Sequence, residues 1–190
     1  MTGIILGCVF GGLALIALII VIWGVATFNS FVRMKNGIEE SFSTMDVYLK
    51  KRYDLIPNLV ETVKGYTKHE NETLTSVIKA RTGAMNATTT EEKLKKENAL
   101  TSALRSIYKL SEAYPELKAD KHFSNLMNQL REIEDEITNA RKYYNGTVKQ
   151  FNTKVEVFPS SIIAKMKKFE KQPLFEVESP EERKNVKVQF

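Results

Sequence analysis

The clearest candidates for metal ligands in this 190-residue chain are its two histidines, His69 and His122. A carboxylate-bridged di-metal site in a helical bundle needs Glu three residues before His, twice, so that both ligands lie on one helix face. Tyr66 and Ala119 occupy those positions, so the motif is absent. His69 and Glu72 could hold one metal with help from elsewhere, but a solvated helix face explains them more simply. We expect no metal and no cofactor.

The sequence offers little for covalent catalysis. It contains no nucleophile elbow, Gly-rich phosphate loop or paired-cysteine motif, and no catalytic residue can be named. The densest polar cluster surrounds one proline and has two open interpretations, a capped and salt-bridged end of a helical bundle or a surface that recognises a partner. We therefore expect that the protein is not an enzyme. The cluster consists of Arg52, Tyr53, Asp54, Pro57, Asn58 and Glu61.

These residues follow a membrane segment. Residues 4–28 carry no charge, and about 20 apolar residues suffice to cross a bilayer as a helix. No Lys or Arg precedes the run, and it is longer than a typical signal-peptide core, which favours a retained helix over a cleaved signal. Basic residues such as Arg33, Lys35 and Lys50 follow the run and should stay in the cytoplasm. We predict a single-pass protein of the cell (inner) membrane, with its N-terminus outside and its domain cytoplasmic.

The anchor contains glycines at a spacing of four, Gly3, Gly7 and Gly11. Small residues on one face let two membrane helices approach closely, which predicts self-association. The alternative is that glycine is simply common in membrane helices.

Apolar residues at helical spacing continue beyond the anchor, and no Gly or Pro separates the anchor from Lys35. The membrane helix should therefore run directly into the domain. Proline disfavours helical geometry at the preceding residue and suits the first turn of a helix. We accordingly predict a tight turn at 53–57, with one long kinked helix as the alternative.

Four helices are expected in the domain, at 29–54, 56–85, 90–113 and 121–157. Thr89 and Glu92 match a capping box before the third helix, and Asp120 can cap the fourth. The turns near Pro57 and Pro115 should lie at the same end of the bundle. Apolar residues of the fourth helix recur every three or four positions, as in an antiparallel bundle.

The predicted fold class is thus all-α, with an N-terminal transmembrane helix continuous with an antiparallel up-down four-helix bundle of long helices. The segments are an anchor (1–28), a bundle domain (29–158) and a short amphipathic helix with an extended tail (159–190). The alternation of Val186, Val188 and Phe190 suggests the extended part of this tail. The expected core residues are Phe42, Leu49, Phe123, Leu130, Ile133, Ile137 and Phe151.

Residues 160–169 could form an amphipathic helix that carries Lys165, Lys167 and Lys168. Such a helix could contact an anionic lipid surface, or its apolar residues Ile162, Ile163 and Met166 could cap the bundle. The net charge of +5 is modest and fits a surface that faces an anionic leaflet. No Arg-rich stripe is present, so we expect no nucleic-acid partner. The expected partners are the bilayer, a second copy of the chain, and unidentified proteins.

Several strings of this sequence are specific to one family, namely Glu39–Glu40, Asp46–Val47, residues 51–66, Ala80–Arg81, residues 112–119, residues 140–145 and residues 158–160. On these strings the chain resembles the LemA family of bacterial membrane proteins over nearly its whole length. The resemblance implies a single-pass membrane protein with a cytoplasmic all-helical bundle, and no established reaction comes with it. The chain departs from the family at 86–90, where an Ala-rich stretch is more usual.

The expected function is that of a non-catalytic, membrane-tethered helical scaffold or adaptor that acts by self-association or partner docking. The alternative is a membrane-associated hydrolase or metal-dependent enzyme with a site in the bundle.

Overall fold

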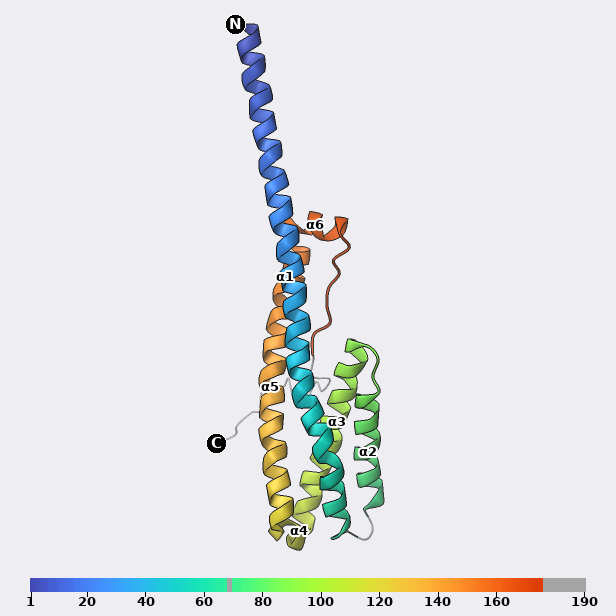
Figure 1. Ribbon diagram of the computed structural model, residues 1–190. Coiled ribbons are helices and arrows are strands. Elements are labelled where there is room, and N and C mark those ends of the chain that lie inside the picture. The colour runs from blue at the N-terminus through green and yellow to red at the C-terminus, as the bar shows by residue number, and fades with distance from the viewer. Residues whose placement is uncertain (68–69, 176–190) are drawn as a thin grey trace, which may run out of the picture. The chain divides into compact units, whose positions relative to one another are not determined.

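The computed structural model describes residues 1–67 and 70–175, and this part of the chain contains helices and no strand (Figure 1). The all-α prediction is confirmed. His69 and the alternation of Val186, Val188 and Phe190 lie outside the described residues. The helices are α1 (Thr2–Lys64), α2 (Asn71–Met85), α3 (Thr90–Ala113), α4 (Pro115–Ala119), α5 (Lys121–Glu156) and α6 (Ser160–Met166).

Helix α1 runs without interruption through Pro57, so the predicted turn at 53–57 is wrong and the alternative of one long helix is correct. Pro57 lacks the N–H that would bond the carbonyl of Tyr53 in an α-helix. The guanidinium of Arg81 on α2 replaces it, with its Nε donating to that carbonyl at 2.7 Å. The chain instead breaks after Lys64, and α2 starts at Asn71.

Helices α3 and α5 start where the capping residues in the sequence predict. The Thr89 hydroxyl accepts the backbone N–H of Glu92 at 3.1 Å, and Asp120 Oδ1 accepts that of Phe123 at 2.7 Å. Only half of the capping box is formed. In a complete box the Glu92 carboxylate would accept the N–H of the N-cap residue Thr89, but here it accepts the N–H of Thr88 at 3.3 Å. Helix α4 was not expected, and it begins with Pro115 at a position where a missing N–H costs nothing.

The chain divides into two compact units. Among the described residues, unit 1 comprises residues 1–41 and 146–172, and unit 2 comprises residues 42–145 and 173–175. The expected segments, an anchor (1–28), a helical bundle domain (29–158) and a short helix with an extended tail (159–190), stay a prediction.

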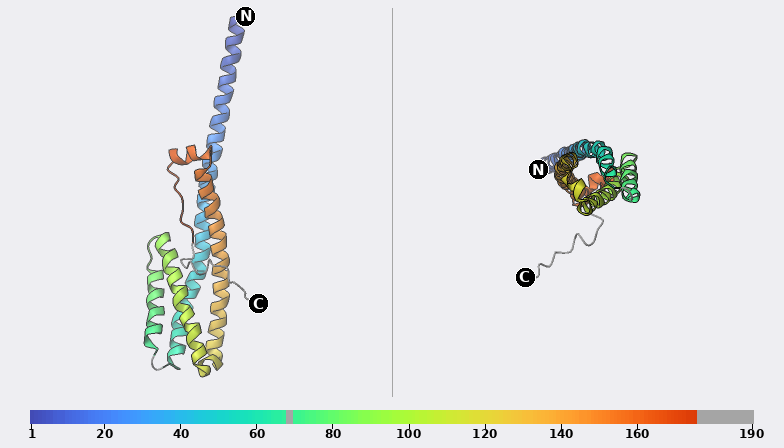
Figure 2. Two further views of the ribbon diagram at one scale, coloured as in Figure 1. Left: turned by 180° about the vertical axis from the view of Figure 1, so that it is seen from behind. Right: turned by 90° about the horizontal axis from the view of Figure 1, so that it is seen from below.

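Unit 2 contains α2, α3, α4 and parts of α1 and α5, with α2 and α3 lying side by side (Figure 2). Of the expected core residues, Leu49, Phe123, Leu130 and Ile137 are buried here. Phe42 and Ile133 were expected to be buried too but are only half-buried. The innermost apolar residues of unit 2 include Met45, Leu49, Ile56, Leu59, Leu100, Ile107, Leu117 and Leu130.

Unit 1 combines the first part of α1 with the end of α5 and α6. Phe151, the remaining expected core residue, is buried in this unit, with its ring centroid 5.8 Å from that of Phe31. Phe169 stacks on Phe31 at 4.8 Å and lies 5.9 Å from Phe28. These rings form a small aromatic core.

The apolar start of α1 is exposed, as Ile5 at 62% and Val25 at 56% illustrate. Among the described residues, α1 is the one helix that is long and apolar enough to span a membrane. Both the exposure and the composition fit membrane anchoring, because such side chains are stable in lipid rather than in water.

Candidate functional site

The most unusual feature of unit 2 is a buried ionic network centred on Arg52, whose side chain is 0% exposed. Arg52 Nη1 donates to Glu134 Oε1 at 2.7 Å and to the hydroxyl of Thr101 at 3.1 Å. Its Nη2 donates to the buried carboxylate of Glu97, which also accepts the hydroxyl of Tyr53. The network therefore joins α1, α3 and α5 within one unit.

The electrostatics of this network favour fixed charges over proton transfer. Burial opposes the charge of Arg52, but attraction to Glu134 and Glu97 outweighs it and raises the pKa of Arg52 above its ordinary value. Burial, and then the charge of Glu97, also raise the pKa of Tyr53, so its hydroxyl stays a donor at neutral pH. The hydrogen bonds of this network connect the three helices that contribute to it.

A second cation, Arg141 on α5, lies in the same unit. Its Nε and Nη2 are buried and have no hydrogen-bond partner among residues 1–67 and 70–175, and the same is true of Arg52 Nε. Its guanidinium carbon lies 3.8 Å from the centroid of the Phe175 ring. Burial, and then the charge of Arg52, lower the pKa of Arg141 to about 10, so Arg141 stays protonated at neutral pH.

Phe175 is held in place by α5. Asn145 accepts the backbone N–H of Phe175 at 2.7 Å and donates to its carbonyl at 2.9 Å, while the Tyr144 hydroxyl donates to the carbonyl of Pro173 at 2.9 Å. Sequence reasoning missed Arg141 and this docked segment. The one available signal was the string at 140–145, which carries part of the family resemblance.

The predicted partner-recognition cluster divides into two parts. Arg52 and Tyr53 are buried, so their assignment to an exposed recognition surface is wrong, because both side chains are used inside unit 2. Asp54, Asn58 and Glu61 are exposed, and Pro57 between them is half-buried. Spacings of four and three place the exposed residues on one face of α1, which we call the acidic face.

An open hollow lies near the end of α1 in unit 2. Its volume is about 410 Å³, and Tyr66, Tyr114, Pro115 and Glu116 line it. The Tyr66 hydroxyl donates to Asp120 Oδ2 at 2.8 Å, which ties the turn after α1 to the start of α5. The hollow thus combines residues from two of the strings that carry the family resemblance, 51–66 and 112–119.

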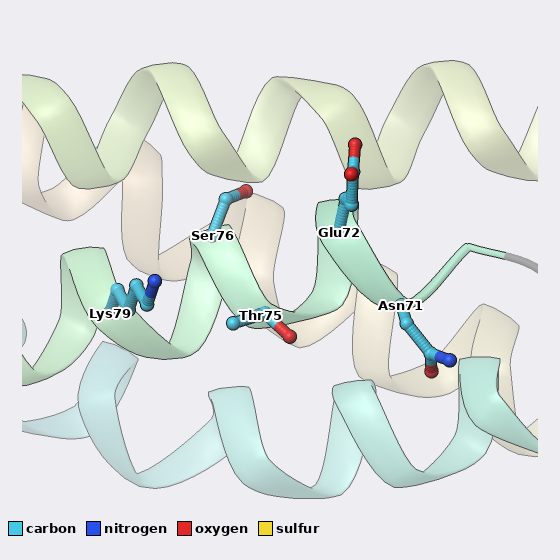
Figure 3. A pocket seen from close by; sticks show the side chains of 5 residues that line it. All are labelled: Asn71, Glu72, Thr75, Ser76 and Lys79. Carbon is cyan, nitrogen blue, oxygen red and sulfur yellow. The ribbon is translucent and has the colours of Figure 1, made fainter.

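A second hollow, of about 320 Å³, lies on the exposed face of α2 (Figure 3). Its lining side chains point in different directions and do not converge on one point. Among the residues that the structure describes, no group of three or more His, Cys, Asp and Glu side chains could hold a metal. The hollow is lined by Asn71, Glu72, Thr75, Ser76 and Lys79.

The other predicted site residues lie in unit 1. A Cβ atom placed on Gly3, Gly7 or Gly11 meets no described atom within 4 Å, so this face of the helix is open. Lys165, Lys167 and Lys168 are all exposed.

A family model and a similar protein both relate this chain to LemA proteins. The model of the LemA family matches residues 41–190. Protein LemA of Metamycoplasma hominis is 28% identical over 140 residues, which cover 72% of this chain and 63% of that protein. Magnetosome proteins MamQ 1 and MamQ 2 of Paramagnetospirillum magneticum are each 21% identical over 175 residues, or 78% of this chain and 64% of theirs.

The chain thus spans less than two thirds of the length of these relatives. The family match covers well over half of the chain, including the Arg52 network and the hollow at Tyr66. The chain belongs to the LemA family.

Proposed function

We propose that the protein is a non-catalytic, membrane-tethered helical scaffold or adaptor that docks a protein partner. The observation that carries this proposal is the buried network in unit 2. Arg52 and Tyr53 both donate to the carboxylate of Glu97, and all three side chains are buried away from a substrate. Ionisable groups used in this way specify how helices pack, whereas a catalytic group must reach a reacting atom.

The tether is the apolar stretch of α1 in the cell (inner) membrane. The exposed Arg33 and Lys35 follow that stretch, which supports an N-terminus outside and a cytoplasmic domain. Reporter fusions after Phe190 test this orientation. A cytoplasmic reporter such as green fluorescent protein should be active, and an active periplasmic phosphatase fusion would reverse the assignment.

The docking surface comprises the acidic face (Asp54, Asn58, Glu61) and the hollow lined by Tyr66, Tyr114, Pro115 and Glu116. Tyrosine side chains offer a large contact area at low cost in conformational entropy and are frequent in protein interfaces. Glu61 is paired with Lys64 of the same helix at 3.4 Å. The charge preference of this surface therefore comes from Asp54 and Glu116, whose carboxylates favour a partner with basic residues because complementary charge promotes encounter and selects partners.

Photocrosslinking in membranes tests the docking surface. A photoreactive amino acid at Asn58, or at Glu116 in the hollow, should crosslink the same partner protein. Asn139 provides a matched control, because it is an exposed asparagine of unit 2 on α5. The charge reversals Asp54→Lys and Glu61→Lys should abolish the crosslink at Asn58. Equal crosslinking at Asn58 and Asn139, or a product that survives charge reversal, would contradict the proposal.

Self-association through Gly3, Gly7 and Gly11 is the second part of the proposal. Gly7→Ile with Gly11→Ile should abolish crosslinked dimers in membranes, because the added side chains hold the helices apart. Gly12→Ile is the matched control, since Gly12 is equally open but lies on another face of α1. If both variants lost the dimers, or if both kept them, the glycine face would not have this role.

A further inference from the structure

Helix α6 and the segment just before it expose three large apolar side chains. Phe158 is 81% exposed, Ile162 is 51% exposed and Met166 is 65% exposed. They recur every four residues, and α6 places Ile162 and Met166 on one face. The interpretation that Ile162 and Met166 cap the bundle is therefore wrong. The inward side of α6 is provided by Ala164, which is buried, and Ile163, which is half-buried.

The position of α6 within unit 1 explains what could cover this apolar face. The Cδ1 atom of Ile163 lies 3.9 Å from a Cβ placed on Gly24, and the Lys167 amino group lies 5.7 Å from the centroid of the Phe28 ring. Gly24 and Phe28 are at the end of the apolar run in α1. Helix α6 thus packs beside the end of the apolar run of α1. It also lies across α1 rather than along it (Figures 1 and 2).

The end of α6 presents positive charge beside the apolar face. Lys168 has a φ of 55°, a left-handed conformation that favours glycine. The bonds from Phe169 N–H to the carbonyl of Ala164, at 2.9 Å, and from Lys168 N–H to that of Lys165, at 3.3 Å, complete a helix-ending motif that usually carries glycine. The chain has a cation at this position, together with the exposed Lys165 and Lys167.

We propose that α6 is a second membrane-contacting element, which lies in the interface of the anionic leaflet that the anchor enters. Phe158, Ile162 and Met166 insert among the acyl chains, and Lys165 and Lys168 bind anionic headgroups. Both interactions are typical of interfacial amphipathic helices, and the lysines act within a Debye length of the surface. This element fixes the first part of unit 1 against the bilayer and does not depend on partner docking in unit 2.

The test uses the full chain in nanodiscs of phosphatidylcholine and phosphatidylglycerol. In a Cys8→Ser background, an environment-sensitive NBD fluorophore is attached at Met166→Cys, and lipids brominated in their acyl chains serve as quenchers. Gln150→Cys is the matched control, because Gln150 is an exposed residue of α5 in the same unit. Circular dichroism establishes that each labelled protein keeps its helical content.

We expect blue-shifted emission and several-fold stronger quenching at Met166 than at Gln150. Lys165→Glu with Lys168→Glu should reduce the quenching at Met166 in anionic discs and change it little in discs of phosphatidylcholine alone. Equal quenching at the two positions would overturn the proposal. Blue-shifted emission without bromine quenching would overturn it as well, since a protein surface would then cover the face. Quenching that the charge reversals leave unchanged would overturn the assignment of anionic headgroups.

Discussion

Arg81 on α2 donates from its Nε to the backbone carbonyl of Tyr53 at 2.7 Å, in place of the N–H that Pro57 lacks. An α-helix interrupted by proline loses this bond and leaves the carbonyl four residues earlier unpaired. The side chain of a different helix thus satisfies the backbone of α1. The same bond ties α2 to α1 within unit 2.

A double-mutant cycle tests this relationship. Arg81→Ala should lower the free energy of unfolding by about 1.5–3 kcal/mol, because a bond from a charged donor is lost. In a Pro57→Ala background the cost should be smaller, since the new N–H of residue 57 bonds the Tyr53 carbonyl. Urea unfolding in detergent micelles measures both values. Equal costs in the two backgrounds would show that Arg81 does not compensate for Pro57.

The buried carboxylate of Glu97 gives a second prediction. Glu97→Ala removes a hydrogen-bond partner of Tyr53 and one of the two ion pairs of the buried Arg52 guanidinium. Breaking a buried pair in this way costs about 3–5 kcal/mol. Glu132→Ala is the control, since Glu132 is exposed on α5, and substitutions of this kind usually stay within about 0.5 kcal/mol. Comparable losses in both variants would contradict a structural role for the network.

The left-handed backbone conformation of Lys168 gives a third prediction. Lys168→Gly should stabilise the fold by about 1 kcal/mol, because glycine adopts a φ of 55° without steric cost. Lys167→Gly is the matched control: its φ is −102°, so glycine gains nothing there and should not stabilise the fold. Thermal unfolding in micelles compares the two. If Lys168→Gly lowered the melting temperature, the side chain would contribute more than the backbone strain costs.

The carboxylate of Asp120 should make the stability of the fold depend on pH. The backbone N–H of Phe123, and then the hydroxyl of Tyr66, lower the pKa of Asp120 below its usual range. A carboxyl with a lowered folded-state pKa stabilises the fold above its unfolded-state pKa, and this contribution is lost as the pH falls through the folded-state value. Asp120→Asn should therefore lower the melting temperature at neutral pH, with the difference shrinking in acid. A difference that is the same at every pH would contradict this.

The sequence predicts those parts of the fold that local signals determine. Helix α3 begins and ends where Thr89 and Pro115 indicate, and Asp120 caps α5 as expected. The turn at Pro57 was wrongly predicted because the carbonyl of Tyr53 receives its hydrogen bond from Arg81, 28 positions after Tyr53 in the chain. Local steric rules for proline do not include such a donor.

The same limit applies to the candidate site. The polar cluster around Pro57 left two interpretations open for Arg52, a salt-bridged bundle end or a surface that recognises a partner, because the sequence does not show which acidic residues lie beside it. Its burial depends on Glu97 and Glu134, which α3 and α5 bring to it. The amphipathic character of residues 160–169 is visible in the sequence, but the exposure of Met166 depends on how α6 packs against α1.

The central claim is that the buried network serves packing while partner docking serves the function. The most direct test replaces the network by Arg52→Met, Tyr53→Phe, Glu97→Leu and Glu134→Gln, which keeps its volume and removes its charges, that of Glu134 included. Replacing a buried ion pair by apolar residues is often neutral for stability. Photocrosslinking from Asn58 in membranes should then capture the same partner in the same yield as in the parent protein. Loss of that crosslink in a variant with the helical content and melting temperature of the parent would contradict the account and place the function in the network itself.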